Sequence, residues 1–209
     1  MTSLIDLESW FSRDRLAPYA HAAGSPDAAE ALYQWNADVS AALWRTLGHV
    51  EVLVRNALHR ELTDWSQHQH GTDRWYVAID RLISYETRND IRLARRRGTR
   101  NGRAETPGRV VAELNLGFWR FLLARRYDGT LWRYCMYRAF PGQRRAEVER
   151  AIATLHVLRN RIGHHEPVHN RPVADLLALA LDVATWIDPA ARDWITAGDT
   201  TPLLISRRP

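Results

Sequence analysis

The stretch that decides the fold spans residues 25–65 and reads SPDAAEALYQWNADVSAALWRTLGHVEVLVRNALHRELTDW. Ser25 followed by Pro26 is a typical helix start, because the hydroxyl caps the first turn and proline is preset for helical geometry. Apolar residues then recur every three or four positions, with only Gly48 able to bend the helix. This pattern predicts one long amphipathic helix that forms the spine of a bundle. Its apolar positions are Leu32, Trp35, Val39, Ala42, Leu43, Leu47, Val50, Leu53, Val54, Ala57, Leu58 and Leu62.

The rest of the chain keeps the helical period, and no segment alternates apolar and polar residues as a half-buried strand does. We therefore expect an all-α fold in a single domain over residues 1–209. Trp35 and Trp44 are expected in its core. Further helices are expected at about 4–11, 85–97, 109–126 with Phe121 inward, from Pro141-Gly142 to about 163, and 173–186, with a turn at 67–73. Residues 98–108 have almost nothing to bury and are expected to form a flexible, Arg-rich loop.

The composition limits the classes of function. The single cysteine, Cys135, excludes an internal disulfide and a Cys-rich zinc site. The longest apolar run, 176–181, is far shorter than the ~20 residues that cross a bilayer. The N-terminal residues are acidic where a signal peptide is basic. We therefore expect a cytoplasmic protein without membrane association.

The basic residues are all arginine: the chain contains 29 of them, no lysine, and a formal net charge of +5. Guanidinium groups grip phosphates bidentately and stack on bases, so this composition favours an anionic partner. Between residues 88 and 103, seven arginines and one aspartate leave a local charge of +6. This segment either embraces an RNA backbone or is a solvated loop. The candidate RNA-binding residues are Arg92, Arg95, Arg96, Arg97, Arg100 and Arg103.

A second informative stretch, residues 158–167, reads LRNRIGHHEP. Arg159 falls within the apolar stripe of its helix, so it needs a polar partner. Asn160 and His164 are four residues apart and share a neighbouring face. Taken one by one, these are a buried ion-pair partner and a histidine near the negative helix end. Taken together, they gather a guanidinium, an amide and an imidazole at one helix end. The stripe comprises Val148, Ile152, Leu155 and Ile162.

This arrangement, arginine, asparagine, three residues and histidine, resembles the signature of the HEPN superfamily, and residues 158–167 resemble its abortive-infection (Abi-like) branch. Residues 51–56 (EVLVRN) are similar to that branch's early helix, with Glu51 and Arg55 matching its glutamate and arginine. Residues 116–119 (LGFW) are similar to its glycine and aromatic segment. The resemblance covers about residues 30–190.

The resemblance implies a HEPN-type helical bundle with a long spine helix and short extra helices. It implies a metal-independent, cofactor-free endoribonuclease, a toxin in phage defence, whose two motifs face each other across a homodimer. In that reading Arg159 clamps the phosphate, Asn160 orients it or the imidazole, and His164 transfers protons. The expected partners are an RNA substrate, a second copy of the chain and a neutralising antitoxin. The alternative is a non-catalytic HEPN RNA-binding or protein-interaction module.

Three further details concern the motif and the residues near it. Either His164 or His165 can be the catalytic imidazole, and His164 is favoured because it shares a face with Asn160. Some superfamily members carry a tyrosine two residues after the histidine, where this chain has Glu166. Glu51 lies one turn before Arg55 among apolar residues, so we expect it to be partly buried and to position an arginine near Arg159.

Residues 165–169 (HEPVH) also match the zinc-protease pattern His-Glu-x-x-His. That site needs both histidines on one continuous helix. Pro167 lies between them and opposes a helix at a cost of ~3 kcal/mol or more. The sequence therefore disfavours zinc proteolysis.

Overall fold

The structure, a computed structural model, describes residues 4–209, with side chains from Asp6 onward, and these residues contain helices and no strand. The all-α prediction is confirmed. The α-helices are α1 (Leu4–Phe11), α2 (Arg13–Ala23), α3 (Pro26–His70), α4 (Trp75–Ala78), α5 (Tyr85–Gly98), α6 (Pro107–Ala112), α7 (Leu116–Leu122), α8 (Arg145–Gly163), α9 (Val173–Ile187), α10 (Pro189–Ala197) and α11 (Thr201–Ser206). Short 3₁₀ or π turns are η1 (Asp80–Leu82), η2 (Arg100–Gly102), η3 (Arg125–Tyr127), η4 (Asp128–Trp132) and η5 (Met136–Ala139).

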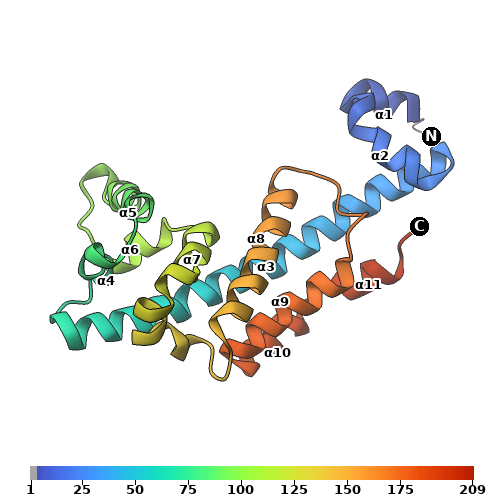
Figure 1. Ribbon diagram of the computed structural model, residues 1–209. Coiled ribbons are helices and arrows are strands. Elements are labelled where there is room, and N and C mark those ends of the chain that lie inside the picture. The colour runs from blue at the N-terminus through green and yellow to red at the C-terminus, as the bar shows by residue number, and fades with distance from the viewer. Residues whose placement is uncertain (1–3) are drawn as a thin grey trace.

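Helix α3 is 45 residues long and runs along the whole molecule (Figure 1). The Ser25 hydroxyl accepts the N–H of Ala28 at 3.3 Å, so the predicted start is confirmed. The helix passes through Gly48 and continues beyond Trp65, so the turn expected from residue 67 begins only at Gly71. Gly71 has φ of 67°, a left-handed conformation that glycine adopts without strain and that ends the helix.

The other helices are arranged along α3 in three groups, most of them in direct contact with it (Figure 1). Helices α1 and α2 lie at its N-terminal end, and α4 to α6 lie at its C-terminal end. Helices α7, α8 and α9 pack on its middle, with α10 and α11 beside α9. One hydrophobic cluster joins residues from Tyr19 to Ile195. The middle group brings together the segments that the sequence singled out.

The prediction of a single helix over residues 109–126 is wrong. Helix α6 ends at Ala112, and α7 begins after Asn115, whose side-chain oxygen accepts the N–H of Phe118 at 3.1 Å. This local cap competes with continuation of the helix. As a result Phe121, expected to point inward, is 52% exposed.

Helices α2, α10 and α11 were not expected from the sequence. Each is short, with 11, 9 and 6 residues respectively, and so offers few helical periods to detect. Short helices are marginal alone and are stabilised by packing. Here α2 and α11 pack on α3, and α10 packs on α9. None of the helices in residues 4–209 combines the length and apolar composition needed to cross a membrane.

The two tryptophans expected in the core have different environments. Trp35 is buried, and its Nε1 donates to the Leu204 carbonyl at 2.7 Å, which ties α11 to α3. Trp44 is 43% exposed, so that expectation is wrong. The face of α3 that carries Trp44 is only partly covered. Gly163 and Arg159, at the end of α8, are the residues that contact the Trp44 ring there.

Candidate functional site

Arg159 lies near the end of α8, against the middle of α3. Its Nε is 3.5 Å from Oε2 of Glu51, and its guanidinium carbon lies 5.0 Å from the centre of the Trp44 ring. The Arg159 and Glu51 side chains are 35% and 20% exposed. The expected partial burial of Glu51 and its contact with an arginine are therefore confirmed. Arg55 donates instead to Asn56, with Nε and Oδ1 3.4 Å apart.

Glu51 also contacts α7. Its Oε1 accepts the backbone N–H of Leu116, the first residue of that helix, at 3.1 Å. An N-terminal helical N–H has no partner within its own helix, so the carboxylate satisfies it. Through Glu51, the segments 51–56, 116–119 and 158–167 meet at one point of the molecule.

His156 is the residue of this site that the sequence reasoning missed. Its Nε2 lies 3.3 Å from the side-chain Nδ2 of Asn160, one helical turn later. A Cβ at Gly117 would lie 3.1 Å from the same nitrogen, so glycine lets α7 approach this closely. The signal was available: His156 precedes Asn160 by four residues and therefore shares its face of α8.

The pKa of His156 is lowered from its ordinary value of 6.5. Burial is the largest cause, the charges of Arg120 and Arg159 act in the same direction, and Glu51 opposes them. The imidazole is therefore neutral at pH 7, and its Nε2 can accept a hydrogen bond from Asn160. We call Trp44, Glu51, His156, Arg159 and Asn160 the Arg159 cluster.

His164 and His165 lie just beyond α8. Gly163 is the last helical residue, and the His164 N–H still donates to the Asn160 carbonyl at 2.9 Å. Both histidine side chains are exposed, and His165 has a left-handed φ of 56°. His165 lines a pocket between α2, α3 and the end of α8. The two imidazoles thus follow the cluster along the chain, and only His164 retains a helical backbone contact with Asn160.

The chain from His165 to His169 is not helical. The side-chain oxygen of Asn36, on α3, accepts the N–H groups of Val168 and His169 at 2.7 and 3.0 Å. The His169 ring is 4% exposed and packs 4.8 Å from the Tyr19 ring. Of the two histidines in the His-Glu-x-x-His pattern, His165 is therefore exposed and His169 is buried, and they do not share a helix. In residues 4–209 no group of three or more His, Cys, Asp and Glu side chains is arranged to hold a metal ion.

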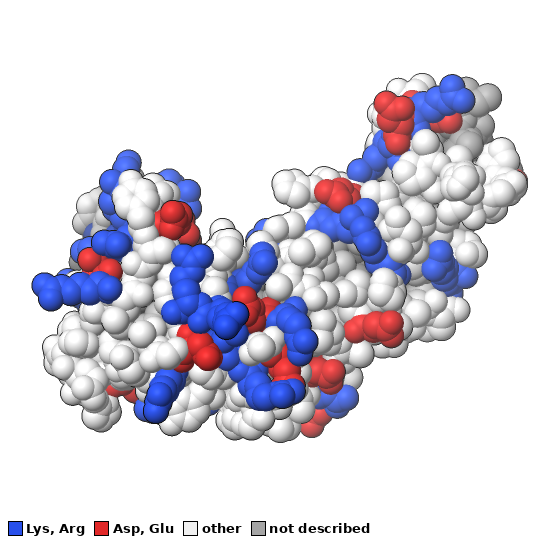
Figure 2. All heavy atoms as spheres, in the orientation of Figure 1, with Lys and Arg blue, Asp and Glu red and all other residues white. Residues whose placement is uncertain are grey.

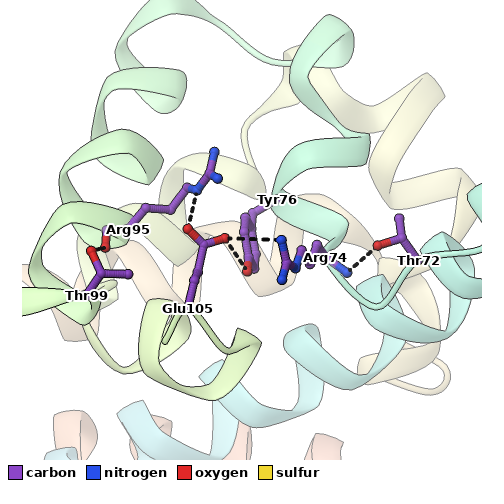
Figure 3. Close-up of polar contacts among 6 residues, drawn as sticks. All are labelled: Thr72, Arg74, Tyr76, Arg95, Thr99 and Glu105. Carbon is purple, nitrogen blue, oxygen red and sulfur yellow. Dashed lines mark hydrogen bonds and ion pairs between the residues drawn. The ribbon is translucent and has the colours of Figure 1, made fainter. Parts of the chain in front are cut away.

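The Arg-rich segment is anchored to the fold at Glu105 (Figure 3). Oε2 of Glu105 accepts from Arg95 Nε at 2.9 Å, Oε1 accepts from the Tyr76 hydroxyl at 3.2 Å, and Arg74 Nη1 lies 4.0 Å away. Arg95 therefore uses its charge within the chain. The other five candidate RNA-binding side chains are exposed: Arg92, Arg96, Arg97, Arg100 and Arg103.

These contacts change the pKa values of the Glu105 carboxyl and of the Tyr76 hydroxyl. Burial raises the pKa of Glu105, but the hydrogen bonds and charges of Arg95, Tyr76 and Arg74 outweigh it, so the pKa lies below its ordinary value of 4.5. Burial and the neighbouring Glu105 carboxylate raise the pKa of Tyr76 to about 12. Residues 98–108 are thus held at Glu105, and also at Gly98, where a Cβ would lie 3.0 Å from the Arg109 carbonyl.

Basic and acidic side chains are intermixed over the middle of the face shown in Figure 2. Further basic side chains project from the end of the molecule that carries α4 and α5. A long anionic ligand would therefore meet the positive charge in separate places.

Comparison of the chain with protein-family models, with curated proteins and with solved structures found no match.

Proposed function

We propose that the chain is a metal-independent endoribonuclease of the HEPN, Abi-like type. The observation that carries the proposal is the Arg159 cluster, in which a partly exposed guanidinium, an amide and a neutral imidazole gather, followed along the chain by two exposed histidines. These are the groups that phosphodiester cleavage needs without a metal: a phosphate ligand and proton-transfer groups.

In the proposed reaction the ribose 2′-oxygen attacks phosphorus and the bond from phosphorus to the 5′-oxygen breaks. One proton leaves the 2′-hydroxyl and one reaches the 5′-oxygen, so the products are a 2′,3′-cyclic phosphate and a 5′-hydroxyl. Arg159 binds the nonbridging oxygens as negative charge accumulates on them. His164 transfers a proton, because an imidazole can serve as either acid or base near neutral pH.

His156 acts as a positioning residue in this scheme. Its neutral Nε2 accepts a hydrogen bond from the Nδ2 of Asn160, which leaves Oδ1 of Asn160 free to face the substrate. Trp44 and Glu51 hold Arg159 in the same way, by a ring contact and an ion pair. The cluster is thus preorganised before RNA binds.

A homodimer would supply the second proton-transfer group from the partner's motif. The face of α3 beside the cluster offers an apolar surface for such a partner: Trp44 and Val52 are each 43% exposed, and a Cβ at Gly48 between them would meet open space beyond the helix's own backbone. A role as a phage-defence toxin and a neutralising antitoxin as its partner follow from the resemblance, and a cytoplasmic location follows from the sequence composition; all three belong to the same proposal.

One observation favours the alternative, a non-catalytic RNA-binding or interaction module. Arg159 is already paired with Glu51 and stacked on Trp44, as a purely structural arginine would be. A structural role predicts that the protein binds RNA, or a protein partner, without cutting RNA. The two proposals therefore differ in one measurable property.

The test is incubation of the purified protein with total RNA in EDTA, followed by analysis of the product ends. We expect cleavage that leaves a 2′,3′-cyclic phosphate or the derived 3′-phosphate. His164→Ala, purified in parallel, controls for contaminating nucleases and should lose about 10²–10⁴ in rate. Strict dependence on Mg²⁺ or Mn²⁺, or equal cleavage by the variant, would contradict the proposal.

A further inference from the structure

A pocket of about 510 Å³ adjoins the Arg159 cluster, between α2, α3 and the end of α8. This volume falls within the range of small-molecule sites, roughly 300–1,000 Å³. Trp44 belongs to both features, because its ring carries the guanidinium of Arg159 and also lines the pocket. A ligand in the pocket and a phosphate at Arg159 would therefore be neighbours.

One wall of the pocket is a single face of α3. Tyr33, Ala37, Ser40 and Trp44 line it and follow one another at intervals of four, three and four residues, so they lie in one row along the helix. Aromatic rings stand at both ends and small side chains lie between them. At 1.5 Å of rise per residue the row is about 16 Å long, enough for a planar base beside an aromatic ring.

Two side chains that line the pocket carry opposite charges. Arg15 comes from α2, and Glu166 comes from the loop after α8. Glu166 also pairs with Arg161, with Oε2 and Nη1 3.2 Å apart, and its side chain is 49% exposed. The loop that carries Glu166 is fastened to α3 by Asn36, which is itself 6% exposed. The carboxylate is therefore presented from a fixed backbone.

We propose that this pocket binds an unpaired guanine base of the RNA next to the phosphate held by Arg159; the inference rests on the proposed endoribonuclease function. Among the four RNA bases, guanine presents two neighbouring acceptors, O6 and N7, which match the arginine fork of Arg15. It also presents two neighbouring donors, N1–H and N2–H, which match the two oxygens of Glu166. Trp44 or Tyr33 then supplies a ring on which the base stacks.

The experiment measures binding of the four ribonucleoside 3′-monophosphates by calorimetry, without any cleavage step. We expect guanosine 3′-monophosphate to bind about fivefold or more tightly than the other three, the discrimination of one good bidentate pair. Glu166→Gln replaces one acceptor by a donor and should remove this preference. Arg161→Gln breaks the same ion pair but leaves Glu166 in place, so it should keep the preference.

A pair of α3 variants locates the binding. Ala37→Trp fills the pocket from its α3 wall and should abolish nucleotide binding. Ala31→Trp is the matched control, because Ala31 is also exposed on α3 but does not line the pocket. Equal affinity for all four nucleotides, or unchanged binding in Ala37→Trp, would overturn the inference.

The two proposals fail separately. If RNA is cleaved in EDTA but the protein shows no guanine preference, the pocket assignment is wrong and the endoribonuclease proposal stands. If guanosine 3′-monophosphate binds with the expected dependence on Glu166 but RNA stays intact, the pocket binds guanine and the catalytic proposal is wrong.

Discussion

Replacement of Arg159 by lysine separates a catalytic from a structural arginine. Lysine keeps the positive charge but loses the planar fork, the Nε that lies 3.5 Å from Glu51 and the stacking on Trp44. A phosphate clamp depends on bidentate geometry as charge develops on the phosphate oxygens. A structural ion pair depends mainly on the charge, which the substitution retains.

The magnitudes of the two effects differ. The pair is partly buried, but lysine retains its charge, so the ion pair should weaken by at most ~1 kcal/mol and the cation–π contact by about 0.5–1 kcal/mol. The unfolding free energy should therefore fall by at most ~2 kcal/mol. Loss of one preorganised contact to a developing oxyanion typically costs about 10²–10³ in rate, or ~2.7–4 kcal/mol. The rate should therefore fall much more than the stability.

The assay combines single-turnover cleavage of a defined RNA with urea unfolding of the same preparations. Arg161→Lys is the matched control, since Arg161 lies two residues later on α8 and its contacts are with Pro167 and Glu166. It should change the rate by less than about threefold, as a substitution outside the clamp. The reasoning is refuted if Arg159→Lys cleaves normally, if both variants lose rate equally, or if Arg159→Lys simply unfolds.

His156→Ala should lower the cleavage rate about twofold to tenfold, because it removes one net hydrogen bond to Asn160. It should also shift the acidic limb of the pH–rate profile. An unchanged profile would show that His156 does not belong to the site. The raised pKa of Tyr76, about 12 against an ordinary 10.0, means that its contribution to stability is complete below pH 10 and is lost as the pH rises towards 12. Thermal unfolding across pH 8–11 should show a smaller loss in Tyr76→Phe than in the wild type; part of the loss remains in the variant because burial also raises the pKa values of Tyr19 and Cys135. Glutamine at four of the five exposed arginines should weaken RNA binding and flatten its salt dependence, whereas Arg95→Gln should chiefly lower the melting temperature by removing the ion pair with Glu105. The four are Arg96, Arg97, Arg100 and Arg103.

Local signals predicted the longest helices, α3, α5, α8 and α9. The Ser25-Pro26 start and the apolar period of α3 concern residues within a few positions of one another, and such short-range interactions can be read directly from a chain. The same holds for the end of α8 at Gly163 and for the break imposed by Pro167. The α6–α7 break was missed because one polar side chain, Asn115, competes with the apolar pattern around it.

The site was partly predictable for the same reason. The grouping of Arg159, Asn160 and His164 follows from helical spacing, and the position of Glu51 among apolar residues predicted that it would contact an arginine. His156 was equally accessible from its spacing to Asn160. The sequence did not predict which arginine Glu51 contacts. Arg55 is near Glu51 in sequence, whereas Arg159 comes near it only when α8 packs on α3.

By itself, then, the sequence determined the helical class, the spine helix and the residues of the motif, all of which depend on periodicity and local sterics. The tertiary structure alone decided that Trp44 lies under Arg159 at the surface, that Arg95 is neutralised by Glu105, and that a pocket opens beside the motif. The Trp44–Arg159 contact and the pocket join residues far apart along the chain, and Arg95 meets Glu105 only because the chain folds back between α5 and α6. Their energies depend on how the helices pack, and no local pattern records that geometry.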